Sequence, residues 1–260
     1  MNAGCDEQFL LLWDIDGTLI EAAEFRRAIY SRLFAEILEL PFKKVISAPG
    51  FSTLEKIRRT LLFHDVTPTD RLVARFSAGL AREYVESREE LVTGGRLLPG
   101  ATAALRHFAA DGRFVQAVLT CTLKAIACAK IEAFGLSPLF DMSVGAYGDD
   151  ALRRVELPDV ARRRCRARTG RHVPRSSTFI IGDTEEDMRA ARCTGVHAVG
   201  VATGRCAPPA LWRAGADVVI LDLTDIALLQ NYLDHLPWRR PDAPIGVPSP
   251  PAVRVPNRPA

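Results

Sequence analysis

Two aspartates, Asp14 and Asp16, are separated by a single residue and directly follow the apolar run Phe9 to Trp13. The run has the length and composition of a buried parallel strand. Gly17 then permits a sharp turn at the carboxyl end of that strand, where open α/β sheets place their ligands. Two carboxylates there can share a divalent cation while Asp14 attacks a phosphorus atom and Asp16 transfers the proton of the leaving group. Taken alone, the pair is also compatible with an ordinary Asp-Gly turn.

A second acidic segment follows another apolar run, over Ile180 to Asp187. The spacing of Asp183 and Asp187 predicts that both lie on one face at the start of a helix. Acids in a first helical turn also complement the helix dipole, which is the plainer interpretation of Glu185 and Glu186. The four aspartates of the two segments would repel one another in one crevice unless a cation neutralises them. Ligands that are all oxygen atoms favour Mg²⁺.

A hydroxyl occupies the corresponding position after a third strand, predicted over residues 114–119. Thr120 follows this strand and is expected at the same sheet edge as Asp14, where it could hold a phosphoryl oxygen. A threonine at this position could equally be a helix N-cap.

The elements that position these residues differ between the two parts of the chain. Residues 21–98 show helical periodicity, with apolar stripes over Phe25–Leu38, Leu54–Leu62 and Leu72–Tyr84, and a loop over Pro41–Phe51. From residue 99 the pattern alternates between helices and short apolar runs, which predicts a doubly wound parallel sheet. The strands are expected over 114–119, up to Val144, and over 178–181, 196–201 and 218–221.

Composition limits the classes of protein that remain. The chain has 260 residues, 48% of them hydrophobic and 25% charged, and its net charge of +3 is too small to argue for nucleic acid. No apolar stretch approaches the roughly 20 residues that span a bilayer. The acidic Asp6 and Glu7 precede the first apolar run, unlike a signal peptide, so we expect a cytoplasmic protein. The six scattered cysteines have no metal-binding spacing and are expected as free thiols.

With these motifs in place, the chain resembles the haloacid dehalogenase (HAD) superfamily of hydrolases, of the phosphatase type with a helical cap. The motifs that match are Asp14-x-Asp16-Gly17-Thr18, then Thr120, then a basic residue, then Gly182-Asp183-Thr184-x-x-Asp187. The resemblance implies a Rossmann-like α/β core over 1–20 and 99–236 and an all-helical cap over 21–98. The proline-rich residues 237–260 are expected to form an extended or disordered tail.

The basic residue of the third motif departs from the family pattern. The family generally has a lysine there, but this chain has no lysine beyond Lys130. Arg154 matches best and Arg153 stays an alternative, since a guanidinium supplies fixed charge and bidentate hydrogen bonds. Cys121 also stands where glycine often follows the threonine.

The resemblance implies a Mg²⁺-dependent phosphomonoesterase that acts through an aspartyl-phosphate on a small phosphorylated metabolite. The nucleophile is Asp14, the acid and base is Asp16, and the phosphoryl oxygens are held by Thr120 and Arg154. The expected metal site comprises Asp14, the backbone carbonyl of Asp16, Asp183 and Asp187, and Asp187 would order either the arginine or a metal-bound water. The expected substrate contacts are Thr18, Thr120, Cys121, Arg154, Lys43 and Lys44.

Other activities of the family remain as alternatives. A phosphomutase of the β-phosphoglucomutase type uses the same residues. A phosphonatase would need a reactive cap lysine, and a catalytically silent HAD-like binding protein would not need the intact aspartates. The expected partner is a small-molecule phosphate ester, without nucleic acid or membrane, and the sequence indicates no protein partner.

Overall fold

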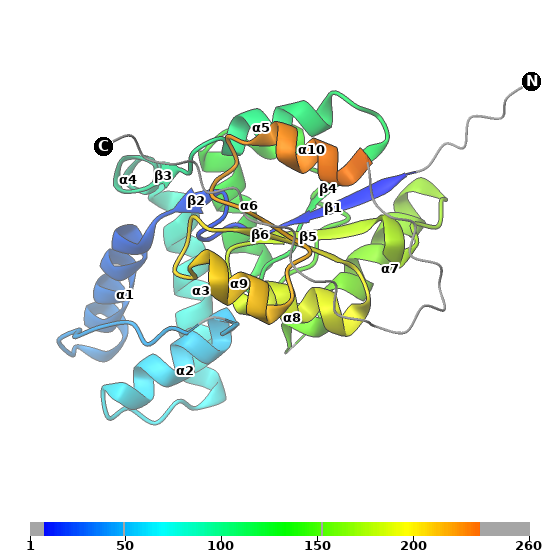
Figure 1. Ribbon diagram of the computed structural model, residues 1–260. Helices are drawn as coiled ribbons and strands as arrows, with labels where there is room; N and C mark the ends of the chain where they lie inside the picture. Colours follow the sequence, from blue (N-terminus) through cyan, green and yellow to red (C-terminus); the bar gives the residue numbers. More distant parts are fainter. Residues whose placement is uncertain (1–7, 49, 152, 235–260) are drawn as a thin grey trace, which may run out of the picture.

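The core of the molecule is a five-stranded sheet in which every strand pair is parallel (Figure 1). The computed structural model describes residues 8–48, 50–151 and 153–234. The strands run in the order β4-β1-β5-β6-β7, with bounds β1 Phe9–Trp13, β4 Phe114–Val118, β5 Thr178–Gly182, β6 His197–Val201 and β7 Val218–Ile220. The predicted α/β class with a doubly wound parallel sheet is therefore confirmed.

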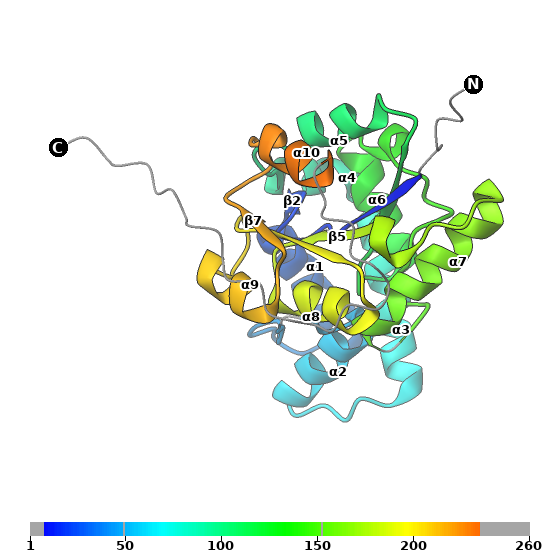
Figure 2. The same cartoon turned by 45° about the vertical axis from the view of Figure 1, so that its right-hand side comes forward.

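Helices cover both faces of this sheet (Figures 1 and 2). One face carries α5 (Ala101–Ala109), α6 (Lys124–Ala133) and α10 (Ile226–Asp234), and the other carries α7 (Leu157–Thr169), α8 (Glu185–Thr194) and α9 (Pro208–Ala214). Alternate residues of β1 enter different cores: Leu11 and Trp13 pack on the first face, Leu10 and Leu12 on the second. Because both faces are covered, the central strand β1 is apolar throughout rather than alternating.

Four helices interrupt the core after the first strand. They are α1 (Ala23–Leu38), α2 (Thr53–Phe63), α3 (Asp70–Glu86) and α4 (Arg88–Gly94). We call this segment the helical insert. It leaves and rejoins the core through β2 (Ile20–Glu21) and β3 (Arg96–Leu97), which pair antiparallel. Its interior is aromatic: the Phe34 ring lies 5.3 Å from Phe76 and 4.4 Å from His64.

The helical insert lies against the carboxyl edge of the sheet. Its helices α3 and α4 pack on α6 of the core. At the start of α2, the backbone N–H of Thr53 donates to the Cys121 carbonyl (3.1 Å), and its Oγ1 accepts from the Leu123 N–H (3.3 Å). The insert therefore borders the loop that carries the second motif.

The short strand expected to end at Val144 was a wrong prediction. Val144 is buried in a turn, and only Ala146 forms an isolated bridge, to Leu119. Ala146 donates to the Val118 carbonyl and accepts from the Thr120 N–H. One bridging residue therefore extends the sheet edge beside Thr120 without forming a strand.

Two further expectations concern the ends of the chain and membranes. The proline-rich segment 237–260 lies outside the described residues. Among the helices of the described ranges, none is both long and apolar enough to cross a bilayer.

Candidate active site

The first aspartate is held rigidly at the end of β1. Asp14 donates its N–H to the Ile181 carbonyl of β5 (2.9 Å) and is only 6% exposed. The chain then turns at Gly17, whose φ of +95° favours glycine. A side chain at Gly17 would lie 2.5 Å from the Asp183 carboxylate. The turn and the close packing both explain why glycine is needed at this point.

Arg154 holds the carboxylate of Asp14. Its Nη2 lies 2.9 Å from Asp14 Oδ1 and also donates to the Leu119 carbonyl (3.2 Å). The guanidinium is buried, whereas Arg153 is exposed and pairs with Glu156. Of the two candidates for the third motif, the structure brings Arg154 to the site.

Asp187 positions that arginine. One of its carboxylate oxygens accepts from Arg154 Nη2, and the other accepts from the Thr184 N–H (3.1 Å) and hydroxyl. Thr184 caps α8, so the first turn of the helix fixes Asp187. Because both oxygens are engaged, the geometry is that of the arginine-ordering role expected for Asp187, and neither oxygen points to a metal position.

The remaining acidic residue, Asp183, lies beside Asp14 in a tightly packed loop. The hydroxyl of Thr18 donates to Asp183 Oδ1 (3.2 Å), and Thr18 is fully buried. Thr18 thus orients Asp183 and does not line the cavity as an expected substrate contact would. A side chain at Gly204 would also collide with Asp183, since its Cβ would lie 1.7 Å from Oδ2.

The electrostatics of this edge favour a bound cation. Burial raises the pKa values of Asp14 and Asp183, and repulsion from neighbouring carboxylates, Asp187 for both of them, adds to this effect. Arg154 acts in the opposite direction on both. The two carboxylates and the nearby backbone carbonyl of Asp16 are all hard oxygen donors, which suits Mg²⁺. The described residues offer no cluster of three or more His, Cys, Asp or Glu side chains as a metal site.

Asp16 has a partner that sequence reasoning missed. Lys130 of α6 is 2% exposed, and its Nζ lies 2.6 and 2.7 Å from the two Asp16 carboxylate oxygens. The ammonium also lies 5.2 Å from the ring centre of Tyr84 on α3. Burial alone would raise the pKa of Asp16, but Lys130, with smaller effects of Arg26 and Lys56, holds it well below its usual value.

One cavity of about 240 Å³ joins these residues to the helical insert. Its core side includes Asp14, Asp16, Asp183 and Asp187 together with Thr120, Cys121 and Arg154. Its insert side includes Arg26 and Lys56. The expected substrate contacts Lys43 and Lys44 are not among the lining residues: both are exposed, and the Lys44 ammonium lies 4.6 Å from the Phe63 ring centre.

The sequence contained a signal for the missed cations. Lys130 falls on the buried face of α6 formed by Ile126, Ala127 and Ile131. A charge on an apolar helical stripe indicates either a buried partner or a ligand. Lys56 of α2 is half-buried and stands next to the buried Ile57, which is a weaker form of the same signal.

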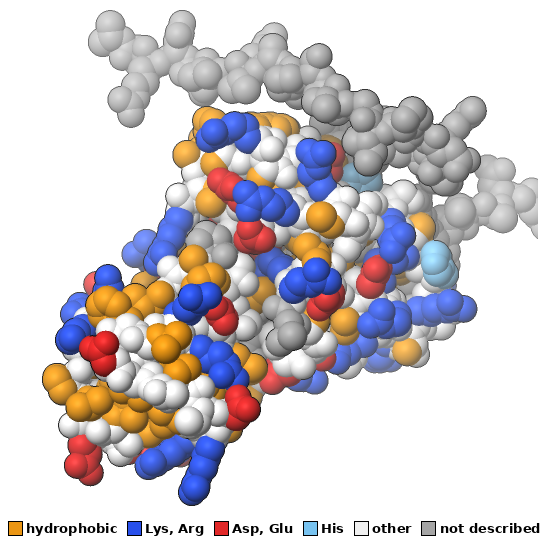
Figure 3. All heavy atoms as spheres, turned by 90° about the horizontal axis from the view of Figure 1, so that it is seen from below, with side chains coloured by type: hydrophobic (Ala, Val, Ile, Leu, Met, Phe, Trp, Pro, Cys, Tyr) orange, Lys and Arg blue, Asp and Glu red, His pale blue; other side chains and the backbone are white. Residues whose placement is uncertain are grey.

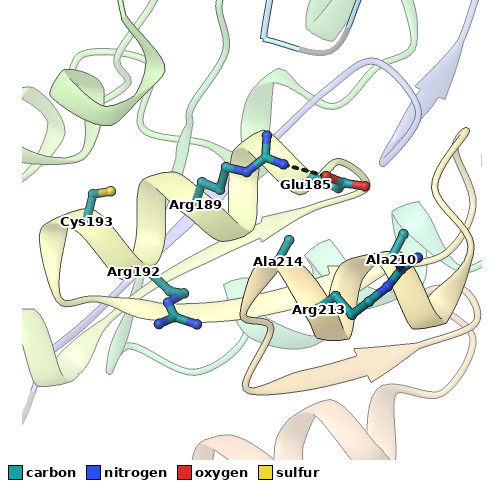
Figure 4. A pocket seen from close by; sticks show the side chains of 7 residues that line it. All are labelled: Glu185, Arg189, Arg192, Cys193, Ala210, Arg213 and Ala214. Carbon is teal, nitrogen blue, oxygen red and sulfur yellow. Dashed lines mark hydrogen bonds and ion pairs between the residues drawn. The ribbon is translucent and has the colours of Figure 1, made fainter. Parts of the chain in front are cut away.

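A second hollow lies between α8 and α9, away from the motif residues (Figure 4). Three arginines, Arg189, Arg192 and Arg213, and the exposed Cys193 line it. Arg189 is paired with Glu185. None of the predicted catalytic residues faces this hollow.

A parallel sheet with acidic residues at its carboxyl edge and a helical insert after the first strand defines a class of α/β enzymes. The pattern of the haloacid dehalogenase-like hydrolases matches residues 11–192, and the chain belongs to this family.

Among relatives, the chain is 29% identical to a phosphoglycolate phosphatase of Cereibacter sphaeroides over 191 residues, which cover 72% of this chain and 82% of the relative. The fold is shared with CbbY from Rhodobacter sphaeroides in complex with phosphate (TM-score 0.64, 22% identity, 84% and 96% coverage). It is also shared with a hydrolase from Pseudomonas syringae (TM-score 0.63, 23% identity, 88% and 99% coverage).

Proposed function

We propose that this chain is a Mg²⁺-dependent phosphomonoesterase that acts on a small phosphorylated metabolite through an aspartyl-phosphate on Asp14. The observation that carries the proposal is the contact of Arg154 with both Asp14 and Asp187 beside Asp183. This arrangement presents one buried carboxylate to the cavity and supplies fixed positive charge next to it.

Each residue then has a defined part in the reaction. Asp14 attacks phosphorus, and the bond to the leaving oxygen breaks as Asp16 donates a proton to that oxygen. Asp16 next accepts a proton from the water that cleaves the aspartyl-phosphate. Its pairing with Lys130 stabilises the ionised form of Asp16, which is the form left after the first proton transfer and the form that accepts the proton in the second. Arg154 and Thr120 bind the phosphoryl oxygens.

Magnesium fits the oxygen donors of Asp14, Asp183 and the Asp16 carbonyl. When bound, it offsets the charge of the phosphate beside these carboxylates. The role of Asp187 is to hold Arg154.

The helical insert is the cap in this proposal, with the predicted bounds 21–98 and a core over 1–20 and 99–236. It closes the cavity over Asp14 and contributes the lining that selects the substrate. The named activity of the Cereibacter relative makes phosphoglycolate a natural first substrate to test.

A panel of phosphorylated metabolites, assayed for inorganic phosphate with and without Mg²⁺, tests the function. Phosphorus NMR of the products separates the hydrolase from the mutase alternative: we expect free phosphate from hexose 1-phosphates or small acid phosphates. Formation of a hexose 6-phosphate without free phosphate would contradict the hydrolase. Absence of turnover across the panel would contradict the enzyme assignment.

A further inference from the structure

Two cations of the helical insert face the catalytic aspartates across the cavity. Arg26 comes from α1 and Lys56 from α2, and both line the same cavity as Asp14 and Asp16. Both side chains are half-buried. Neither forms a hydrogen bond or ion pair through its side chain with any other described residue.

This lack of partners is unusual within the insert. Its other cations fall into two groups. The first forms ion pairs with carboxylates and comprises Arg32, Arg58, Arg59, Arg82 and Arg88. The second is exposed to water and comprises Arg27, Lys43, Lys44, Arg71, Arg75 and Arg96. Only Arg26 and Lys56, among the described residues of the insert, are cations partly removed from water without a partner.

The neighbouring carboxylates do not neutralise Arg26 and Lys56. Asp16 interacts electrostatically with Lys130, Arg26 and Lys56, but both of its oxygens are within 2.7 Å of Lys130. Glu21 lies near Arg26, yet its Oε1 accepts the N–H of Ala23 (2.8 Å). In the part of the cavity around Asp16, three cations therefore face two carboxylates, which leaves one positive charge in excess there. The other carboxylates of the cavity lie beside Arg154.

The ammonium group of Lys56 is partly desolvated, and its pKa shows this. Burial lowers its pKa, and attraction to Asp16 offsets that only in part. A cation that is partly withdrawn from water without a partner is costly, and a bound anion would remove that cost.

The transferred phosphoryl group does not need these cations. It meets Arg154 and Thr120 on the core side of the cavity. The cations lie instead around Asp16, the residue that protonates the leaving oxygen, so they lie on the side of the leaving group.

We propose that Arg26 and Lys56 bind a second anionic group of the substrate, so that the enzyme selects small phosphomonoesters whose leaving group carries its own carboxylate or phosphate. The inference rests on the proposed function and names the substrate class of that site. The cavity of about 240 Å³ and the closeness of both cations to Asp16 require a short link between the two anionic groups.

Three esters with the same two-carbon link test the inference on the wild-type enzyme. Phosphoglycolate carries a carboxylate, ethylene glycol bisphosphate carries a second phosphate, and 2-hydroxyethyl phosphate is neutral at that end. Hydrogen bonds to charged groups are worth about 1.5–3 kcal/mol, so we expect kcat/KM for an anionic ester to exceed that for the neutral ester by about 10- to 150-fold. The preferred anionic ester identifies the second group.

Substitutions then assign the preference to the two cations. Lys56→Met and Arg26→Met should each reduce the ratio of anionic to neutral kcat/KM at least several-fold, and Lys56→Arg should retain much of it. Arg59→Met serves as the matched control, because Arg59 is an exposed cation on the same helix and pairs with Glu55. Its ratio should equal that of the wild type.

The outcomes separate the inference from the function on which it rests. If the wild-type enzyme hydrolyses the neutral ester as efficiently as both anionic esters, the inference is overturned while the phosphatase stands. A preference that survives both Met substitutions overturns it as well. If none of the three esters nor p-nitrophenyl phosphate releases phosphate with Mg²⁺ present, the proposed function itself fails.

Discussion

At the scale of single residues, one guanidinium organises the acidic site. Arg154 is buried between Asp14 and Asp187, and these two carboxylates raise its pKa against the opposing effect of burial. Its charge remains fixed at any pH at which the enzyme would work. The nucleophile and the phosphoryl group can therefore share a donor that needs no reorganisation during the reaction.

Replacement of this arginine should greatly reduce the activity. Arg154→Ala should lower kcat/KM by about 10²- to 10³-fold, comparable to removal of an oxyanion donor, and Arg154→Lys should cost less. Arg153→Ala should be nearly neutral, because Arg153 is exposed and pairs only with Glu156. Steady-state kinetics of the three folded variants checks this. If the Arg153→Ala variant lost most of its activity while the Arg154→Ala variant remained active, the assignment of Arg154 to the third motif would be contradicted.

The pair of Asp16 and Lys130 gives a prediction about stability. Asp16→Asn leaves the ammonium of Lys130 buried without a counter-charge, so it should destabilise the fold by about 2–3 kcal/mol, a discounted value because Asp16 is a quarter exposed. Adding Lys130→Met should recover much of that loss, since Met fills the same space without charge. Urea unfolding of the two single variants and the double variant measures the coupling. Strictly additive costs would show that the pair contributes nothing.

At the scale of elements, the parallel arrangement of the strands determined which site residues could be predicted from the sequence to lie together. Asp14, Thr120 and Asp183 each follow an apolar run, and the carboxyl ends of parallel strands meet at one edge, so their meeting was predictable. The orientation of the Asp187 carboxylate was not predictable from the sequence, because the capping of α8 decides whether it points to a metal or to Arg154. Lys130 was missed because its partner lies 114 residues away. The helix α4 and the β2–β3 pair were missed because each is too short for periodicity to reveal.

The contact between the insert and the core can be weakened at one hydrogen bond. Thr53→Val keeps the shape of the side chain but removes the acceptor for the Leu123 N–H. One such bond is worth about 0.5–1.5 kcal/mol, so kcat/KM should fall by about 2- to 10-fold if closure of the insert is needed for turnover. Thr93→Val on α4 is the control, because the Thr93 hydroxyl bonds only within its own helix. Wild-type kinetics in Thr53→Val would argue against a role for this contact.

At the scale of the whole molecule, charge is divided between the two sides of one cavity. The core edge concentrates carboxylates, which favour a divalent cation, and the insert side presents Arg26 and Lys56. The outer surface shows no such division: in Figure 3, basic and acidic side chains are interspersed on the visible face. The small net charge of +3 is in keeping with that mixture. The strong local fields therefore belong to the cavity.

Crowding of the core carboxylates predicts how pH affects the metal-free protein. Folding raises the pKa of Asp183 from 3.8 to about 8, and that of Asp14 also rises. The unfolded chain releases these protons first, so this contribution to stability falls as pH rises from 3.8 towards 8. The depressed pKa of Asp16 acts oppositely: its contribution is present above 3.8 and is lost only at lower pH.

Magnesium should therefore raise Tm more at about pH 8 than at about pH 5, because the cation competes with protons for the same oxygens. Thermal unfolding with Mg²⁺ and with chelator at both pH values measures the difference. Asp183→Asn should abolish most of the Mg²⁺ effect. A shift that is independent of pH, or that persists in Asp183→Asn, would contradict the metal site.

The aspartyl-phosphate on Asp14 is the central claim, and Asp16→Asn offers the most direct test of it. With p-nitrophenyl phosphate the leaving group needs no acid, so the first step should proceed, while the missing base should block hydrolysis of the intermediate. We predict a burst of p-nitrophenolate stoichiometric with enzyme. Borohydride reduction followed by peptide mass spectrometry should then place homoserine at position 14 and nowhere else. Turnover without a burst, or reduction at another residue, would contradict the account.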